Sequence, residues 1–370
     1  MAGHHDQASG PLAPNAEDVV PSSATGDPAS AAAQQAGADA LSDVLEVVRL
    51  TGALFFIVDA SPPWVAEVPA SQGLAPAILP RVQHVVSYHV VREGACWCQM
   101  PAEAPVWLEP GDVIVAPHGD AYVLSTAPTI SSGLTPDQTL TWFREMASGQ
   151  FPFVVDDAGG DGERLHIVCG FLGCDALPFN PVLATLPRML HVRRPRASES
   201  DRLDALVEFA VSESRAPHAG SRSVLIRIGE LMFVEILRRY LTTLTAEETG
   251  WLAGLRDPLV GRALASLHKG PNHSWTLEKL AREVGASRSV LAQRFTQFVG
   301  EPPMHYLTRW RMQRAAGLLA DGAAKVSAVA REVGYDSEAA FSRAFKKLTG
   351  VAPTAWRNRL ASPGLRTAGQ

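Results

Sequence analysis

Apolar residues recur at helical spacing in two matching stretches of the last third of the chain. In each stretch, four residues follow the i, i+3, i+4, i+7 pattern that marks one buried face of a helix. The second stretch repeats the first after an offset of 49 residues. The two stripes consist of Leu277, Leu280, Ala281 and Val284, and of Val326, Val329, Ala330 and Val333. The pattern predicts two short helices, each ending at a glycine.

A second helix follows each glycine after a short turn. Gly285 and Gly334 can take the left-handed conformation that closes a helix, and Ser287 and Ser337 stand where an N-cap begins the next one. The second helices are predicted at 288–299 and 338–349, with a linker helix at 304–320. Each unit therefore has the form of a helix-turn-helix. Two copies with matched caps favour a DNA-binding domain over two ordinary helical hairpins.

The outward faces of the second helices carry side chains suited to reading DNA. Gln can bond an adenine edge through two contacts and Arg a guanine edge, while small side chains let a helix approach the bases closely. We therefore predict sequence-specific contacts with the major groove of double-stranded DNA. The predicted contact residues are Ser287, Arg288, Ser289, Ala292, Gln293 and Thr296 in the first unit, and Ser337, Glu338, Ala339, Ser342, Arg343, Lys346 and Lys347 in the second.

Three longer motifs, at residues 287–295, 300–312 and 329–346, surround these helices. Together with the paired Val-Gly turns they resemble the AraC/XylS-type transcription regulators over about the last 100 positions. The resemblance implies a seven-helix domain whose two recognition helices occupy successive major grooves, in a bacterial protein that forms a homodimer and contacts RNA polymerase. Ala292 leaves the first recognition helix with fewer polar groups than many relatives have.

Short apolar runs separated by Pro and Gly fill the chain from about residue 41 to 192, and they predict strands of an all-β barrel or jelly roll. The runs are residues 53–58, 84–91, 105–108, 112–116 and 165–169. The spacing of Gly111, Pro117 and Gly119 resembles the second cupin motif, and His89 with Glu93-Gly94 resembles part of the first. The stretch is thus similar to the cupin-type sensing domain found ahead of such DNA-binding domains.

These patterns divide the chain into five parts. We predict a disordered tail at residues 1–40, a cupin-like domain at 41–195, a helical linker or dimerisation segment at 199–245, the double helix-turn-helix domain at 251–360 and a flexible tail at 361–370. The predicted fold class is therefore multidomain: an N-terminal all-β cupin-like barrel or jelly roll with appended helices, followed by an all-α domain.

Charge is divided unevenly between these parts. Residues 1–250 hold 15 Lys and Arg against 30 Asp and Glu, whereas residues 251–370 hold 18 against 8, so net charges of −15 and +10 make up the overall −5. A basic C-terminal domain is expected of a DNA-binding protein. The predicted phosphate contacts are Arg294, Arg309, Arg311, Lys346, Lys347 and Arg357. No export signal or apolar run of membrane-spanning length is apparent, so we expect a cytoplasmic protein without a membrane partner.

A small organic effector is the expected ligand of the barrel. The positions that would hold a cupin metal are Ser87, His89, Glu93 and Tyr122, so two of four ligands are missing, although His118 could substitute for one. We therefore predict no metal and no cofactor. The predicted effector-lining residues are His89, Trp97, Trp107 and Tyr122.

Two alternatives remain at this point. Cys96 and Cys98 share a strand face, and with Cys169 and Cys174 they could form a metal- or thiol-dependent sensor, although buried Cys more often packs as a small hydrophobe. A cupin enzyme fused to a DNA-binding domain is disfavoured, because the metal ligands are incomplete and no nucleophile elbow, phosphate loop or HExxH motif is present. The chain is therefore not expected to be an enzyme.

Overall fold

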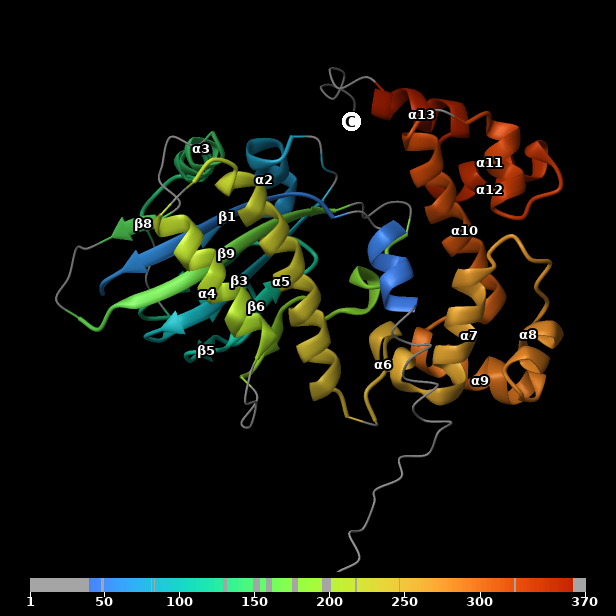
Figure 1. The fold of residues 1–370 in the computed structure, drawn as a ribbon, viewed down its shortest axis with the longest axis horizontal. Coiled ribbons are helices and arrows are strands. Elements are labelled where there is room, and N and C mark those ends of the chain that lie inside the picture. Colours follow the sequence, from blue (N-terminus) through green and yellow to red (C-terminus); the bar gives the residue numbers. More distant parts are fainter. Residues whose placement is uncertain are drawn as a thin grey trace, which may run out of the picture.

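The computed structural model describes residues 40–47, 50–80, 82, 84–128, 132–148, 154–157, 162–174, 179–194, 201–216, 218–245, 247–322 and 324–361. The predicted disordered and flexible tails lie almost wholly outside these residues. A β-rich part and a helical part stand side by side (Figure 1). No helix in the described ranges is long and apolar enough to cross a membrane.

A six-stranded sheet forms the centre of the β-rich part. Its order is β10-β6-β3-β9-β1-β8, with β1 and β8 parallel and the other pairs antiparallel. The strands are β1 (Leu50–Ala60), β3 (His84–Glu93), β6 (Val113–Ala116), β8 (Val154–Asp157), β9 (Leu165–Cys174) and β10 (Leu190–Val192). All ten residues of β9 are buried, because helices cover one face of the sheet and a second sheet the other. Burial on both faces explains why these strands appear in the sequence as unbroken apolar runs.

The second sheet has the order β2-β7-β4-β5. Its strands are β2 (Val65–Val68), β4 (Cys96–Gln99), β5 (Val106–Leu108) and β7 (Tyr122–Ser125). Two helices that the sequence analysis did not predict, α2 (Ser71–Ile78) and α3 (Pro136–Ala147), pack with each other and with this inner core. Helix α3 begins with a capping box in which Thr135 and Gln138 bond each other's backbone N–H.

Helices α4 (Arg202–Arg215) and α5 (Ser221–Thr243) cover the outer face of the six-stranded sheet (Figure 1). The Tyr88 hydroxyl donates to the Gly229 carbonyl of α5 at 3.0 Å, and the Tyr88 ring occupies the space that a Cβ at Gly170 would need. Sequence alone left open whether these helices cover the barrel or form a dimer seam. Their inner faces cover the barrel.

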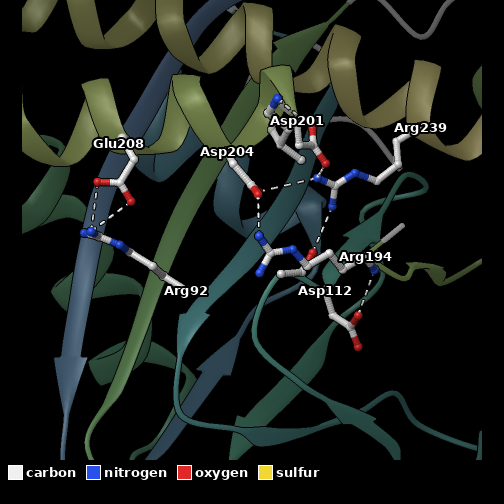
Figure 2. Close-up of polar contacts among 9 residues, drawn as sticks. Arg92, Asp112, Arg194, Asp201, Asp204, Glu208 and Arg239 are labelled. Carbon is white, nitrogen blue, oxygen red and sulfur yellow. Dashed lines mark hydrogen bonds and ion pairs between the residues drawn. The ribbon is translucent and has the colours of Figure 1, made fainter. Parts of the chain in front are cut away.

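A polar network holds the same helix pair against the sheet (Figure 2). The Arg239 side chain, 4% exposed, pairs with Asp201 and with Asp204 at 3.6 Å, and donates to the Gly111 carbonyl at 2.8 Å. Arg194 pairs with Asp204 at 2.9 Å. Because the partners come from α4, α5 and the loops beside β6 and β10, the network connects the helix pair to the barrel rim. A buried ionic group that loses one partner destabilises a protein strongly.

Eight helices are described in the predicted all-α domain, one more than the seven that the resemblance implied, because a short helix, α6, precedes the first expected one. They are α6 (Trp251–Arg256), α7 (Pro258–Lys269), α8 (Leu277–Glu283), α9 (Arg288–Val299), α10 (Pro303–Ala320), α11 (Val326–Glu332), α12 (Glu338–Thr349) and α13 (Pro353–Ala361). Both predicted second helices are confirmed to the residue, and the linker helix α10 begins one residue earlier than predicted.

The apolar core of the first helix-turn-helix unit is continuous with the core beneath α4 and α5. Buried side chains from Phe55 in the barrel through Trp251 to Phe295 and Trp310 belong to one cluster. The second unit instead has its own cluster, which contains Met312 and Phe345. Helix α10 contributes to both clusters and connects them.

Candidate nucleic-acid interface and barrel cavity

Local capping builds the two helix-turn-helix units. Ser287 Oγ accepts the Val290 N–H and Ser337 Oγ accepts the Ala340 N–H, each at 3.3 Å. Gly285 and Gly334 have φ values of 72° and 84°, a left-handed backbone that favours glycine. The turn chemistry predicted from sequence is therefore present in both copies.

The predicted reading faces of α9 and α12 are open to solvent. All predicted contact residues are exposed except Ala292 and Ser342, which are half-buried. Within the described part of the chain, Gln293 and Arg343 make no side-chain hydrogen bond or ion pair with the rest of the protein. These two side chains are therefore available to base edges, as the sequence analysis predicts.

Three of the predicted phosphate contacts also have partners within the protein. Arg294 Nε lies 2.6 Å from the Asp257 carboxylate, which is 1% exposed. Arg311 donates to the carbonyls of Pro271 at 2.7 Å and His273 at 2.9 Å. Arg309 pairs with Glu301 at 3.2 Å. The structure thus gives these guanidinium groups structural partners, which the basic character of the sequence alone does not reveal.

A hydrogen bond joins the barrel to the linker helix α10. The Phe179 N–H donates to Gln313 Oε1 at 2.8 Å, and the Gln313 side chain is buried. The Phe179 ring lies beneath the Arg309 guanidinium at 3.9 Å and edge-on to Tyr306 at 5.7 Å. The loop that carries Phe179 follows β9 and leads to the 3-10 turn η1 (Leu183–Thr185). Barrel and first unit are therefore coupled by specific polar contacts as well as by apolar packing.

A cavity of about 700 Å³, counting its open mouth, lies between the two sheets and α3. Apolar and aromatic side chains from β1, β2, β9 and α3 form most of its wall. Its lining includes Phe56, Val58, Trp64, Glu67, His89, Leu124, Thr139, Trp142, Phe143, Ile167, Cys169 and Phe171. A concave, mostly apolar space with a few polar groups is the usual form of a small-molecule site.

His89 is the centre of a small polar chain at the cavity wall. Its Nδ1 lies 3.0 Å from Cys169 Sγ, and its Nε2 makes a short hydrogen bond with the Tyr122 hydroxyl. Burial lowers the pKa of His89 to about 3 and raises the pKa of the Cys169 thiol well above its usual value. At neutral pH this chain therefore consists of uncharged groups.

The four predicted effector residues occupy different places. His89 lines the cavity, and Tyr122 lies behind it as its hydrogen-bond partner. Trp97 and Trp107 instead pair with each other across β4 and β5, with centroids 5.0 Å apart, and Trp107 is 43% exposed. The wall contains Trp64 and Trp142 instead. The Thr135 capping box was the sequence signal that could have located α3 and, with it, Trp142.

The four cysteines of the alternative thiol sensor do not form one cluster. Cys169 and Cys174 are five residues apart on β9, so they face opposite sides of the sheet and belong to different apolar clusters. Among the described residues, no group of three His, Cys, Asp or Glu is placed to hold a metal ion. The candidate substitute ligand His118 lies 2.8 Å from the Leu186 carbonyl, and the Glu93 side chain is 66% exposed.

Comparison with known proteins supports both halves of this architecture. Residues 39–242 match the family described as Cupin, and residues 280–359 match a helix-turn-helix domain. The chain is 32% identical over 330 residues to a putative AraC-like transcription regulator of Streptomyces antibioticus, covering 86% of this chain and 98% of that protein. It is 30% identical over 336 residues to such a regulator of Streptomyces lividans, covering 88% and 100%. It is also 27% identical over 277 residues to the RCS-specific HTH-type transcriptional activator RclR of Escherichia coli, covering 75% and 85%.

Proposed function

The chain belongs to the AraC-like transcription regulators and binds DNA through its helix-turn-helix domain, and from this premise we propose that a small organic molecule in the cupin cavity controls its hold on DNA. The observation that carries the proposal is the continuous core that runs from the barrel to the first helix-turn-helix unit. A ligand changes an equilibrium only by binding one state better than another. Because the barrel packs against the first DNA-binding unit, a ligand that favours one state of the barrel can also favour one arrangement of that unit.

Two matched variants test this proposal. Val58→Trp fills the cavity from its half-buried wall, whereas Val123→Trp adds the same ring at a half-buried position outside the lining. DNA affinity of the full chain is measured by fluorescence anisotropy, with and without compounds that raise its melting temperature. We expect Val58→Trp to keep basal DNA binding and lose the ligand response, and Val123→Trp to keep both. A response that survives in Val58→Trp would place the sensor outside the cavity.

On DNA, we propose that α9 and α12 enter two major-groove segments about one helical turn apart, roughly 34 Å. Helix α10, with 18 residues, spans about 27 Å at 1.5 Å per residue and separates the two units. Hydroxyl-radical footprinting should show two protected segments on one face of the duplex for each DNA-binding domain. A single protected segment would contradict the two-groove arrangement.

We further propose a homodimer formed by the outer faces of α4 and α5. Phe209 on α4 is 52% exposed and Leu231 on α5 is 53% exposed, so each helix presents a large apolar side chain that a partner could cover. Analytical ultracentrifugation of Phe209→Asp and Leu231→Asp should show monomers if this face is the seam. Contact with RNA polymerase, absence of catalysis and a cytoplasmic location are likewise proposals, and they follow from the role of a DNA-binding regulator.

A further inference from the structure

One large apolar side chain stands on the outer face of the first predicted recognition helix, α9. Val290 is 51% exposed, and it belongs to none of the apolar clusters in the described part of the chain. Around the helix axis it lies about 60° from Gln293 but about 140° from the buried Phe295, at roughly 100° per residue. Val290 therefore shares the solvent-facing side of α9 with Gln293 and takes no part in the core.

Helix capping does not account for a valine at this position either. Val290 is the third residue of α9 after the N-cap Ser287, and a glutamine or glutamate there would complete a capping box. Helix α3 has such a box, formed by Thr135 and Gln138. In α9, Ser287 Oγ accepts the Val290 N–H, but an aliphatic side chain cannot return a hydrogen bond. The Val290 side chain therefore serves neither core nor cap, and it faces whatever α9 binds.

An aliphatic side chain has one favourable partner among the base edges of the major groove. Of the four bases, thymine alone presents a methyl group there, at C5, and apolar contact with that group reads it. The N-terminal residues of a recognition helix are the ones that reach base edges. In a helix, valine has one strongly preferred χ1 rotamer, so its methyl groups are already fixed in position before DNA binds.

The spacing of Val290 and Gln293 places their contacts close together on the DNA. Residues three apart on a helix have Cβ atoms about 5–6 Å from each other, and base pairs stack about 3.4 Å apart. The two side chains therefore reach bases within about two base pairs of each other. A glutamine that bonds adenine and a valine that packs on thymine together favour an A·T-rich segment.

We propose that Val290 determines base specificity in the first half of the DNA site by packing on the C5-methyl group of a thymine next to the base that Gln293 contacts. The second unit lacks this contact, because the equivalent residue 50 positions later is Ala340, which is half-buried. This inference rests on the proposed placement of α9 in the major groove. It adds a requirement for thymine that the proposed placement does not contain.

Replacing thymine by deoxyuridine removes the C5-methyl group and leaves base pairing intact, so it tests this contact directly. The full chain is titrated on its best site from binding selections, with each thymine replaced in turn. One replacement, close to the base whose preference Gln293→Ala relaxes, should weaken binding about fourfold, the effect of one buried methyl group. Val290→Ala should weaken binding to the unmodified site about as much and should no longer respond to that replacement, while every other replacement keeps its parental effect.

Two further variants separate recognition from folding. Val290→Gln completes the capping box with Ser287, so it should keep the parental melting temperature and yet lose the response to the same deoxyuridine. Leu348→Ala shortens the other large exposed apolar side chain in the described part of the DNA-binding domain, and it should keep all parental responses.

The outcomes distinguish this inference from the proposed two-groove arrangement. A deoxyuridine response that is equal in the parent and in both Val290 variants overturns the inference, as does a selected site without thymine beside the Gln293 contact. Coupling between Val290 and one thymine, on a site with a single protected segment in footprinting, supports the inference and contradicts the two-groove arrangement. Two protected segments without that coupling do the reverse.

Discussion

The two helix-turn-helix units have the same sequence pattern but different surroundings. Phe295 of the first unit packs on Tyr306 in a core that continues into the barrel, whereas Phe345 of the second packs on Phe341 and Trp356 in a core of its own. Their outer faces differ as well. Gln293, Thr296 and Gln297 occupy the positions that Arg343, Lys346 and Lys347 occupy in the second unit, 50 residues later.

This difference suggests a division of labour between the units. The first unit, which has fewer basic side chains on its reading face and shares its core with the barrel, is the one that a change in the barrel can reach directly. The second unit, which carries Arg343, Lys346 and Lys347 and has its own core, is the one that we expect to supply most of the attraction to phosphate. Duplicated sequence therefore reproduces local structure, while the contacts of each copy decide its role.

The largest expected effect comes from removing the equivalent core phenylalanines. Phe295→Ala and Phe345→Ala each remove a fully buried ring, which costs about 3–5 kcal/mol of stability. Phe345→Ala should unfold the second unit alone, whereas Phe295→Ala should destabilise the first unit together with the barrel. Hydrogen exchange with mass spectrometry resolves the two patterns. Equal loss of protection throughout the chain in both variants would show that the two cores unfold as one.

Lowering the pH should destabilise the barrel and the first unit more than the second unit. Burial lowers the pKa of both His89 in the barrel and His268 in α7 to about 3, and residues 312–361 contain no histidine. Unfolded histidines titrate near pH 6.5, so between pH 6.5 and 3 the unfolded state binds more protons and stability falls as pH falls. The loss is at most about 1.4 kcal/mol per pH unit for each imidazole.

Calorimetry from pH 6.5 to 5, where most carboxylates stay ionised, measures this effect. The transition of the barrel and first unit should move to lower temperature, and the transition of the second unit should move less. His268→Gln and His89→Gln should each reduce the pH dependence of the first transition. If both transitions shift equally in the parent protein, the imidazoles are not the groups responsible.

The hydrogen bond between Phe179 and Gln313 provides the next test of whether the barrel is coupled to the DNA-binding units. Gln313→Leu keeps the volume of the buried side chain and leaves the Phe179 N–H without its acceptor, at a cost of about 1–3 kcal/mol. We expect weaker coupling: the ligand still raises the melting temperature of the barrel but changes DNA affinity less. Gln313→Glu, which retains an acceptor oxygen, serves as the partner variant. An unchanged DNA response in Gln313→Leu would move the coupling to the apolar packing.

Sequence predicted the two DNA-binding units far better than the cavity, for a physical reason. Caps such as Ser287 and Gly300 act on neighbours within a few residues, so a local pattern determines where α9 begins and ends. Cavity walls depend on which strands pair, and alternation alone does not separate Trp97, on the outside, from Trp64, on the inside. Asp257, which pairs with Arg294, and Phe179, which lies beneath Arg309, are likewise distant in sequence, so a count of charges does not reveal these internal contacts.

Base recognition should divide between the two reading faces. Arg343→Ala should cost about 1–3 kcal/mol at a site with a guanine at the contacted position and should relax base preference there. Gln293→Ala should do the same for an adenine in the other half of the site. Binding selections from randomised DNA give both preferences directly. A uniform loss on all sequences would instead assign Arg343 to a phosphate.

The smallest expected effect concerns how DNA affinity depends on salt concentration, which should differ between variants of the two units. Each Lys or Arg that neutralises a phosphate releases a counterion, so log affinity falls with log salt by slightly less than one for each contact. Lys347 is exposed near the end of α12 and should contribute one such contact, so Lys347→Ala should reduce the slope by about one and weaken all sequences alike. Gln297→Ala, at the equivalent position of the first unit, should leave the slope unchanged, because it carries no charge. A parental slope in Lys347→Ala with altered base preference would show that α12 enters the groove on a different face, and that the second unit is not the main source of phosphate binding.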